Sequence, residues 1–177
     1  GKTAPIYEAA NKELTQWNYR GNMCDTAWDC PQMIPVGDQW LYVWSKGASP
    51  HYEVGSFDPE SARFTREKKG KLDQAKNYHT ISFSTDDQGQ HTTYSWITGT
   101  KGKGWNNCFA IPRVITLGAD GHPVQRPVEA IHKLRGEKES VVGITGSKVL
   151  NTRSDTVEIQ AAFEQIDQGR CGLHLRR

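Results

Sequence analysis

"QWLYVWS", residues 39–45, is the stretch that decides the fold class. Its aromatic and β-branched side chains are typical of a strand, and the turn-forming residues of "KGASP" (46–50) end it. A second short strand, "HYEVGSF" (51–57), follows and leads into a turn in which Pro59 presets the backbone. Together these stretches predict antiparallel β structure.

The same pattern recurs along the chain. "NYHTISFS" (77–84) and "QHTTYSWITG" (90–99) flank a tight connection, so we predict a hairpin with Tyr78, Thr80 and Ser82 on one side of its first strand. We therefore predict an all-β fold.

Further strand and loop signals follow this hairpin. "KGKGWNNC" (101–108) is a glycine-rich loop, and "AIPRVITL" (110–117) is another strand. Strand units of roughly 40 to 50 residues are typical of a β-propeller, although a β-sandwich would give a similar strand density.

Helical signal is sparse. "YEAANKELTQW" (7–17) and "PVEAIHKLRGE" (127–137) could each form one or two turns. Apolar residues alternate in "DTVEIQAAFEQ" (155–165) and "RCGLHLRR" (170–177), which predicts two strands joined by "IDQG" (166–169), although the first of these also has good helix formers. An isolated hairpin is marginal in water, so this tail needs more sheet than the chain supplies.

Composition excludes several classes of protein. The chain has 177 residues and a net charge of +2, so it lacks the basic excess of a nucleic-acid-binding protein. No apolar run approaches the ~18 residues of a membrane-spanning helix, so we expect no membrane segment. Four cysteines and six histidines show no metal-ligand spacing, and we expect no cofactor. Cys24 and Cys30 could pair, but free thiols fit equally well.

"AWDCPQM" (27–33) carries the most suggestive chemistry. Asp29 lies between Trp28 and Cys30, and Pro31 stiffens the chain after them. Burial among such groups would disfavour the charged carboxylate, and the acid could then donate a proton near neutral pH. The alternative is a surface acid that caps a backbone N–H.

Six Trp and six Tyr suit either stacking on sugar rings or the core of a β-rich fold.

Five stretches, taken in order, resemble glycoside hydrolase family 32, the invertases, inulinases and fructan hydrolases. "AWDCPQMIPVGDQWLYVWS" is similar to the family's Glu-Cys-Pro segment, and "YEVGSFDPESARF" to a segment ending in Asp-Pro-Glu. "LDQAKNYHTISF" resembles an Asp-Tyr-Gly-Lys strand, and "GWNNCFAIPRVITLGADGHPVQRPVEAIHKLR" gives the closest match. "VEIQAAFEQ…GLHLRR" resembles the start of the family's C-terminal β-sandwich.

The resemblance implies a five-bladed β-propeller followed by a sandwich. Residues 1–140 would form a partial propeller of about three blades, and residues 141–177 a linker and the first strands of the sandwich. The implied ligand is a fructose-containing sugar such as sucrose, inulin or levan. The family resemblance favours a secreted protein, while the sequence itself leaves the compartment open.

The resemblance also implies roles for individual residues. Asp29 would be the general acid/base, with Cys30 beside it tuning its pKa. Asp73 and Lys76 would hold sugar hydroxyls, and Trp105 would present its indole to a fructosyl ring. The alternative for Asp73 and Lys76 is a solvated charge run, and the alternative for Trp105 is a loop Trp packed under its own turn.

Arg113 is expected to be an architectural ion-pair donor. His79 and His91 replace other residue types of the family and receive no role.

Two family motifs have no counterpart, namely those of the nucleophile Asp and of the transition-state-stabilising Arg-Asp-Pro. We expect both upstream of Gly1, and Asp58, which precedes Pro59 in a different context, does not replace them. Asp29 is also one methylene shorter than the family's Glu. We therefore expect the chain to be inactive alone, and to need a complementing chain or to self-associate through open blade edges.

Overall fold

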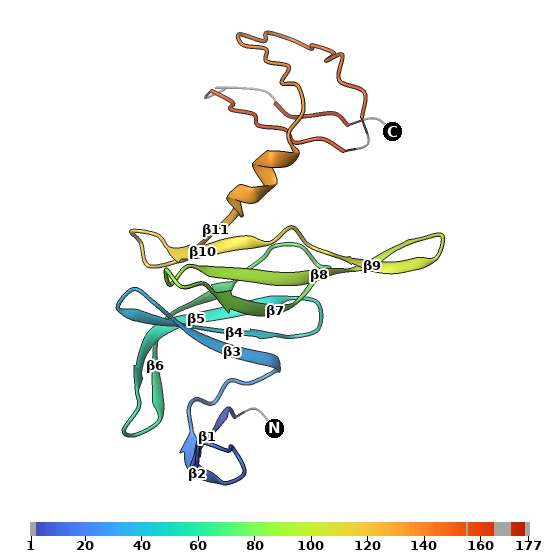
Figure 1. The fold of residues 1–177 in the computed structure, drawn as a ribbon. Coiled ribbons are helices and arrows are strands. Elements are labelled where there is room, and N and C mark those ends of the chain that lie inside the picture. Colours follow the sequence, from blue (N-terminus) through green and yellow to red (C-terminus); the bar gives the residue numbers. More distant parts are fainter. Residues whose placement is uncertain (1–2, 155, 165–170, 176–177) are drawn as a thin grey trace. The chain divides into compact units, whose positions relative to one another are not determined.

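The computed structural model describes residues 3–154, 156–164 and 171–175 (Figure 1). The chain divides into two compact units, residues 1–128 and residues 129–177. Within the described residues, every strand lies in the first unit and the only helix in the second.

One four-stranded sheet of the first unit is a simple antiparallel meander. It consists of β3 (Asp29–Val36), β4 (Gln39–Ser45), β5 (Pro50–Asp58) and β6 (Arg63–Lys71), each paired with the next along the chain (Figure 1). The strands predicted at 39–45 and 51–57 are therefore confirmed as β4 and β5.

Strand β6 was not predicted from the sequence. Its residues include Arg66, Lys68, Lys69 and Lys71, which look like a solvated charge run. β6 ends the sheet, where only β5 pairs with it. Charged side chains on such an edge discourage pairing with another chain, which explains a strand without apolar alternation.

The second sheet has the strand order β11-β10-β8-β7, and β9 pairs with β8 beside this path. Its members are β7 (Tyr78–Thr85), β8 (His91–Gly102), β9 (Trp105–Phe109), β10 (Arg113–Leu117) and β11 (Pro123–Pro127). The predicted hairpin is confirmed as β7–β8, and the predicted glycine-rich loop is a second hairpin, β8–β9.

A β-bulge changes the expected alternation in β7. Tyr78 and Ile81 are both buried, because the register with β8 shifts between His79 and Ile81. Thr80 is the extra residue, so Tyr78, Thr80 and Ser82 do not share one side as predicted. A bulge inserts one unpaired residue and reverses the faces beyond it.

The main core lies between the two sheets, where β3, β4 and β5 contact β7. Alternate residues of each strand face this core, as the two-residue period of a strand requires. Its buried members are Ile34, Val36, Leu41, Val43, Tyr52, Val54, Leu72, Tyr78, Ile81, Ala110 and Ile115. The tryptophan-rich stretch at 39–45 thus contributes Leu41 and Val43 to it.

The N-terminal segment is β structure, and the helical turns considered for residues 7–17 are not formed. β1 (Pro5–Ala9) pairs with β2 (Trp17–Asn22). The side-chain oxygen of Asn11 accepts hydrogen bonds from the backbone N–H groups of Thr15 and Gln16, which closes a turn between the strands. This turn overrides the good helix propensity of the intervening residues.

The second unit begins with a 3-10 helix, η1 (Glu129–Leu134), which confirms helical turns within residues 127–137. The predicted tail strands are not formed in the described residues 156–164 and 171–175, and the predicted connection at 166–169 lies outside them. Strands need partners to satisfy their backbone groups, and a short tail supplies too few. Among the described residues, no helix has the length and apolar character needed to cross a membrane.

Candidate active site

Asp29 is the first residue of β3, where its backbone pairs with that of Ser45. The register between β3 and β4 then shifts between Asp29 and Gln32, so a bulge follows the carboxylate directly. Asp29 is exposed, and the burial suggested by its bulky neighbours is absent. Trp28 next to it lies beneath the Lys46 ammonium, 4.5 Å from the ring centroid.

Cys30 occupies the bulge that follows Asp29. Its φ of 51° lies in the left-handed region, which non-glycine residues rarely adopt. Its Sγ lies within weak hydrogen-bonding distance of the Thr80 hydroxyl oxygen, at 3.9 Å. Thr80 is itself the bulged residue of β7 and has a φ of 52°. Two bulges therefore meet side chain to side chain beside Asp29, and bulges are frequent next to active sites.

All four cysteines are free, so the pairing considered for Cys24 and Cys30 is not formed. Cys24 instead donates to the Thr26 carbonyl oxygen at 3.1 Å. Burial raises the pKa of the Cys24 thiol, whereas Cys30 is exposed.

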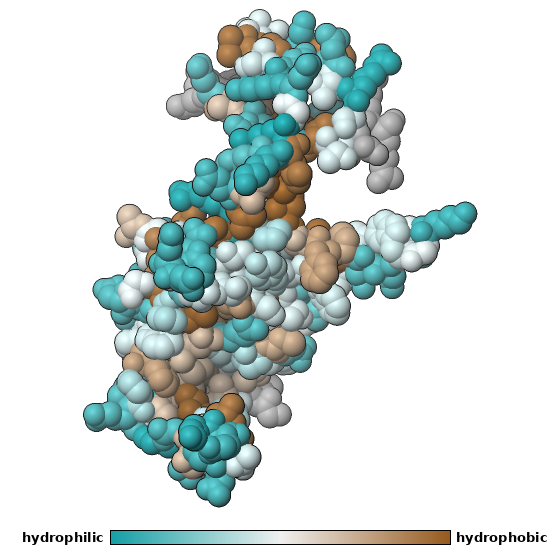
Figure 2. Space-filling view, viewed as in Figure 1, coloured by the Kyte–Doolittle hydropathy of each residue, from teal (hydrophilic) through white to brown (hydrophobic). Residues whose placement is uncertain are grey.

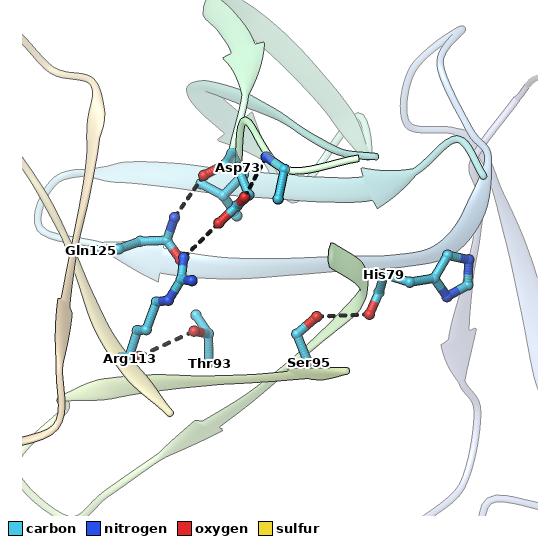
Figure 3. Close-up of polar contacts among 8 residues, drawn as sticks. Asp73, His79, Thr93, Ser95, Arg113 and Gln125 are labelled. Carbon is cyan, nitrogen blue, oxygen red and sulfur yellow. Dashed lines mark hydrogen bonds and ion pairs between the residues drawn. The ribbon is translucent and has the colours of Figure 1, made fainter. Parts of the chain in front are cut away.

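Asp73 has structural partners for both carboxylate oxygens. Arg113 donates to Oδ2 at 2.7 Å, and the backbone N–H of Ala75 donates to Oδ1 at 2.7 Å (Figure 3). The guanidinium of Arg113 also lies over the Tyr78 ring, 4.6 Å from its centroid. Arg113 is thus the architectural ion-pair donor predicted. Lys76 is exposed in the same loop before β7.

Trp105 begins β9 and is about half exposed. It pairs with Gly102 in the β8–β9 hairpin, and its indole fills the space that a side chain at Gly102 would need. This is the arrangement of a Trp packed on its own turn. Trp105 therefore lies far along the hairpin from Trp96, another β8 residue: Gly102 follows Trp96 by six residues, which corresponds to roughly 20 Å of strand.

Asp58 caps its own turn. Its carboxylate accepts hydrogen bonds from the Ser61 hydroxyl and the Glu60 backbone N–H. The Ser61 hydroxyl is the main cause that lowers the pKa of Asp58.

The structure thus brings Asp29 and Cys30 of β3 next to the start of β7, and it keeps Trp105 on a separate hairpin. It also adds residues that the sequence did not point to, namely His79, Thr80 and Trp96. The Trp96 indole N–H donates to Nδ1 of His79 at 2.8 Å. In the sequence, the only signal for this contact was the presence of His79 in a predicted strand. The pairing of His79 with Trp96 follows from the register between β7 and β8.

The chemistry available here is that of a single exposed acid beside a thiol and a hydroxyl. Such a set can donate or accept a proton, but retaining glycoside hydrolysis needs a second carboxyl group about 5 to 5.5 Å away. Within the described part of the chain, no group of three or more His, Cys, Asp or Glu side chains could hold a metal ion.

Comparison with known proteins identifies the family and supports the fold. The model of the glycosyl hydrolases family 32 N-terminal domain matches residues 2–127. The chain therefore belongs to glycosyl hydrolase family 32, and its all-β fold is a partial propeller of that family.

Curated relatives are similar at low identity. Sucrose-6-phosphate hydrolase of Staphylococcus xylosus is 22% identical over 170 residues, which cover 80% of this chain and 33% of that protein. Fructan 1-exohydrolase of Hordeum vulgare is 28% identical over 134 residues, which cover 68% of this chain and 22% of that protein. The chain spans a third or less of the length of these relatives.

Solved structures support the fold. Fructan 1-exohydrolase IIa (E201Q) of Cichorium intybus in complex with 1-kestose superposes with a TM-score of 0.65 at 17% identity, covering 76% of this chain and 32% of that one. The GH32 β-fructofuranosidase BmSUC1 of Bombyx mori gives a TM-score of 0.64 at 19% identity, covering 75% of this chain and 33% of that one.

Proposed function

We propose that this chain is the acid/base-bearing part of a β-fructofuranosidase-like hydrolase that acts on sucrose or fructans with retention. Asp29 serves as the proton donor, and the nucleophile and the transition-state stabiliser come from outside residues 1–177, for example from a complementing chain. Residues 1–140 then form the later propeller blades, and residues 141–177 the linker and the start of the sandwich. The main support is the position of Asp29 at the start of β3, beside the two facing bulges.

The length of Asp29 limits the rate of this reaction. Its carboxyl group is about 1.5 Å shorter in reach than that of Glu. A displacement of about 1 Å can cost on the order of 100-fold in rate. The Asp29→Glu variant of the native assembly should therefore hydrolyse sucrose or inulin faster.

The test compares the purified chain with the assembly isolated from its native source. The chain alone should not turn over sucrose, and the assembly should lose activity on Asp29→Asn. Asp87→Asn is the control, because Asp87 is an exposed acid in the β7–β8 turn. Turnover by the chain alone, or full activity of the Asp29→Asn assembly, contradicts the proposal.

A non-catalytic role in sugar binding is the second candidate, and the half-exposed indole of Trp105 favours it. Asp73 and Lys76 would then contribute hydrogen bonds to the sugar hydroxyls. Calorimetry with fructose, sucrose and inulin tests this candidate. Binding that survives Asp29→Asn and disappears with Trp105→Ala supports it, and the absence of heat with all three sugars contradicts it.

A separate proposal concerns how the open sheet face is covered. Tyr94, Trp96, Phe109 and Ile111 on or beside β8 and β9 are each 43% or more exposed. Figure 2 shows apolar surface beside the β8–β9 hairpin. Such a face favours association with a complementing blade or with a second copy.

Light scattering after size-exclusion chromatography distinguishes these two partners. A dimer of the chain that Phe109→Glu dissociates supports self-association through this face. Val142→Glu is the control, because Val142 is as exposed as Phe109 but lies in the other unit. A clean monomer contradicts self-association and leaves the complementing chain as the partner to isolate.

A further inference from the structure

His79 has a defined hydrogen-bonding state. Its Nδ1 accepts the indole N–H of Trp96 at 2.8 Å, and the two ring planes are inclined by 25° with centroids 5.8 Å apart. These values describe rings that lie edge to edge, because an indole N–H donates in the plane of its ring. A nitrogen that accepts this proton carries none itself, so His79 is neutral and protonated at Nε2.

The same Nδ1 atom connects His79 to the bulge of β7. Oγ1 of Thr80 lies 2.8 Å from Nδ1 of His79 and 3.9 Å from Sγ of Cys30. The hydroxyl has a single proton, which it donates to the nearer acceptor, Nδ1 of His79, beside the Trp96 N–H; its oxygen can then accept the weakly donating S–H of Cys30. The contacts run from Trp96 on β8 through His79 and Thr80 on β7 to Cys30 on β3, and one peptide bond then leads to Asp29.

Backbone strain makes this chain of contacts informative. Thr80 is β-branched and Cys30 carries a Cβ, yet both have φ near 50°. Such residues stay in the left-handed region only where the surrounding structure holds them. The backbone before the bulge is anchored, because the buried Ser95 hydroxyl donates to the His79 carbonyl oxygen at 2.7 Å (Figure 3). The ring of His79 points away from the Arg113–Asp73 pair in that view.

We propose that His79 is a positioning residue: its Nδ1, held by Trp96, fixes Thr80, and through Thr80 it keeps Cys30 in the left-handed conformation that sets the direction of Asp29. The catalytic consequence rests on the proposed function of Asp29. His79 itself touches no reacting atom.

The chain offers a matched control for this contact. Oγ1 of Thr85 lies 2.8 Å from Nδ1 of His91, on the same pair of strands. Thr85 is the last residue of β7, so this Thr–His pair lies at the end opposite to Asp29. A general loosening of the hairpin would follow from the loss of either pair, whereas the proposed positioning depends only on His79.

NMR spectroscopy of the full 177-residue chain tests the proposal without any need for activity. Long-range proton–nitrogen correlations should show His79 protonated at Nε2, and Trp96→Phe should give a mixture of the two neutral forms. His79→Leu and Thr80→Val should change the HN–Hα coupling and Cα shift that report φ at Cys30, and should move the Asp29 carboxyl resonance. His91→Leu should leave Cys30 and Asp29 unchanged.

His79→Asn serves as the conservative rescue, because the amide oxygen of Asn can occupy the place of Nδ1. This variant should keep the HN–Hα coupling and Cα shift of Cys30, which we call the Cys30 signature. An unchanged Cys30 signature in both His79→Leu and Thr80→Val overturns the proposal, as does an equal change in His91→Leu. Thr80→Val decides the outcome if His79→Leu does not fold.

Activity of the native assembly separates this inference from the proposed function. If the assembly hydrolyses fructosides, His79→Leu should lower kcat by on the order of 10- to 100-fold with KM little changed, and His79→Asn should retain most of the rate. An unaltered kcat overturns the inference. If the assembly is inactive, the proposed function fails, and the NMR result still decides whether His79 positions Asp29.

Discussion

Arg113 donates to Asp73 across 2.7 Å, and this ion pair joins the loop before β7 to β10. The Asp73 side chain is 13% exposed and that of Arg113 is 29% exposed, so the pair is largely shielded from water. A carboxylate engaged in this way holds the sheet together whether or not it also meets a sugar.

We expect Asp73→Asn and Arg113→Met each to lower the free energy of unfolding by about 1–3 kcal/mol, because each leaves a shielded charge without its partner. Urea denaturation of the full chain measures this loss. Arg20→Gln is the control, since its pair with Glu8 is more exposed and should contribute under about 1 kcal/mol. Equal stability of the Asp73 variant and the natural chain would show that the ion pair is not structural.

Gly55 should not tolerate a side chain. It lies opposite the bulge of β6, and a Cβ there would overlap the carbonyl oxygen of Thr65 on β6. Backbone atoms cannot move aside as a flexible side chain can, so Gly55→Ala should destabilise the fold by about 1–3 kcal/mol or more.

Gly136→Ala is the matched control for this substitution, because a Cβ at Gly136 would meet no atom within 4 Å. Its effect should stay below about 0.5 kcal/mol. Urea midpoints of the two variants give the comparison, and an unchanged midpoint for Gly55→Ala would contradict the close approach of β5 and β6 at this position.

The second unit carries a pH-dependent ion pair. Arg135 donates to both carboxylate oxygens of Glu158, at 2.7 and 2.6 Å, and this lowers the pKa of Glu158 from 4.5 to about 2. A lowered pKa means that the contact contributes stability above pH 4.5 and loses it as the pH falls towards 2.

Carboxyl-carbon NMR titration should find this low pKa, and Arg135→Gln should move it back towards 4.5. High salt should raise it as well, because both side chains are exposed and screened. Arg153→Gln, at another exposed position of the same unit, should leave the titration unchanged. A Glu158 that titrates near 4.5 in the natural chain would contradict the contact.

The cysteines should differ in reactivity. Burial raises the pKa of Cys24, which lowers its thiolate fraction, whereas Cys30, Cys108 and Cys171 are exposed. Iodoacetamide at pH 8, followed by peptide mass spectrometry, should therefore label Cys24 slowest. The rates should converge in denaturant, and rapid labelling of Cys24 in the folded chain would be the contrary result.

Much of the β structure follows from local sequence. The stretch at 39–45 predicts β4 because β-branched and aromatic residues suit a strand. Asp87, Gln88 and Gly89 predict the turn of the β7–β8 hairpin, and the structure adds Asp86, whose carboxylate accepts hydrogen bonds within this turn. The five ordered motifs between residues 27 and 177 likewise point to the family, since the order of residue types along a chain can be recognised without coordinates.

Other features depend on contacts between residues far apart in the chain. β6 forms from a charged run because β5 offers an edge on which it can pair. Residues 7–17 do not form a helix, because β1 and β2 pair across a turn capped by Asn11. Asp73 shows the same dependence, because its Arg113 partner lies 40 residues away.

The sequence by itself determined the fold class, the family and the candidate acid Asp29, because strand alternation and motif order are local properties of the chain. Only the tertiary structure decided that Cys30 and Thr80 meet in facing bulges and that Trp96 holds His79 beside them. The register shift in β7 sets those contacts, and a register is fixed by pairing between strands rather than by either strand alone.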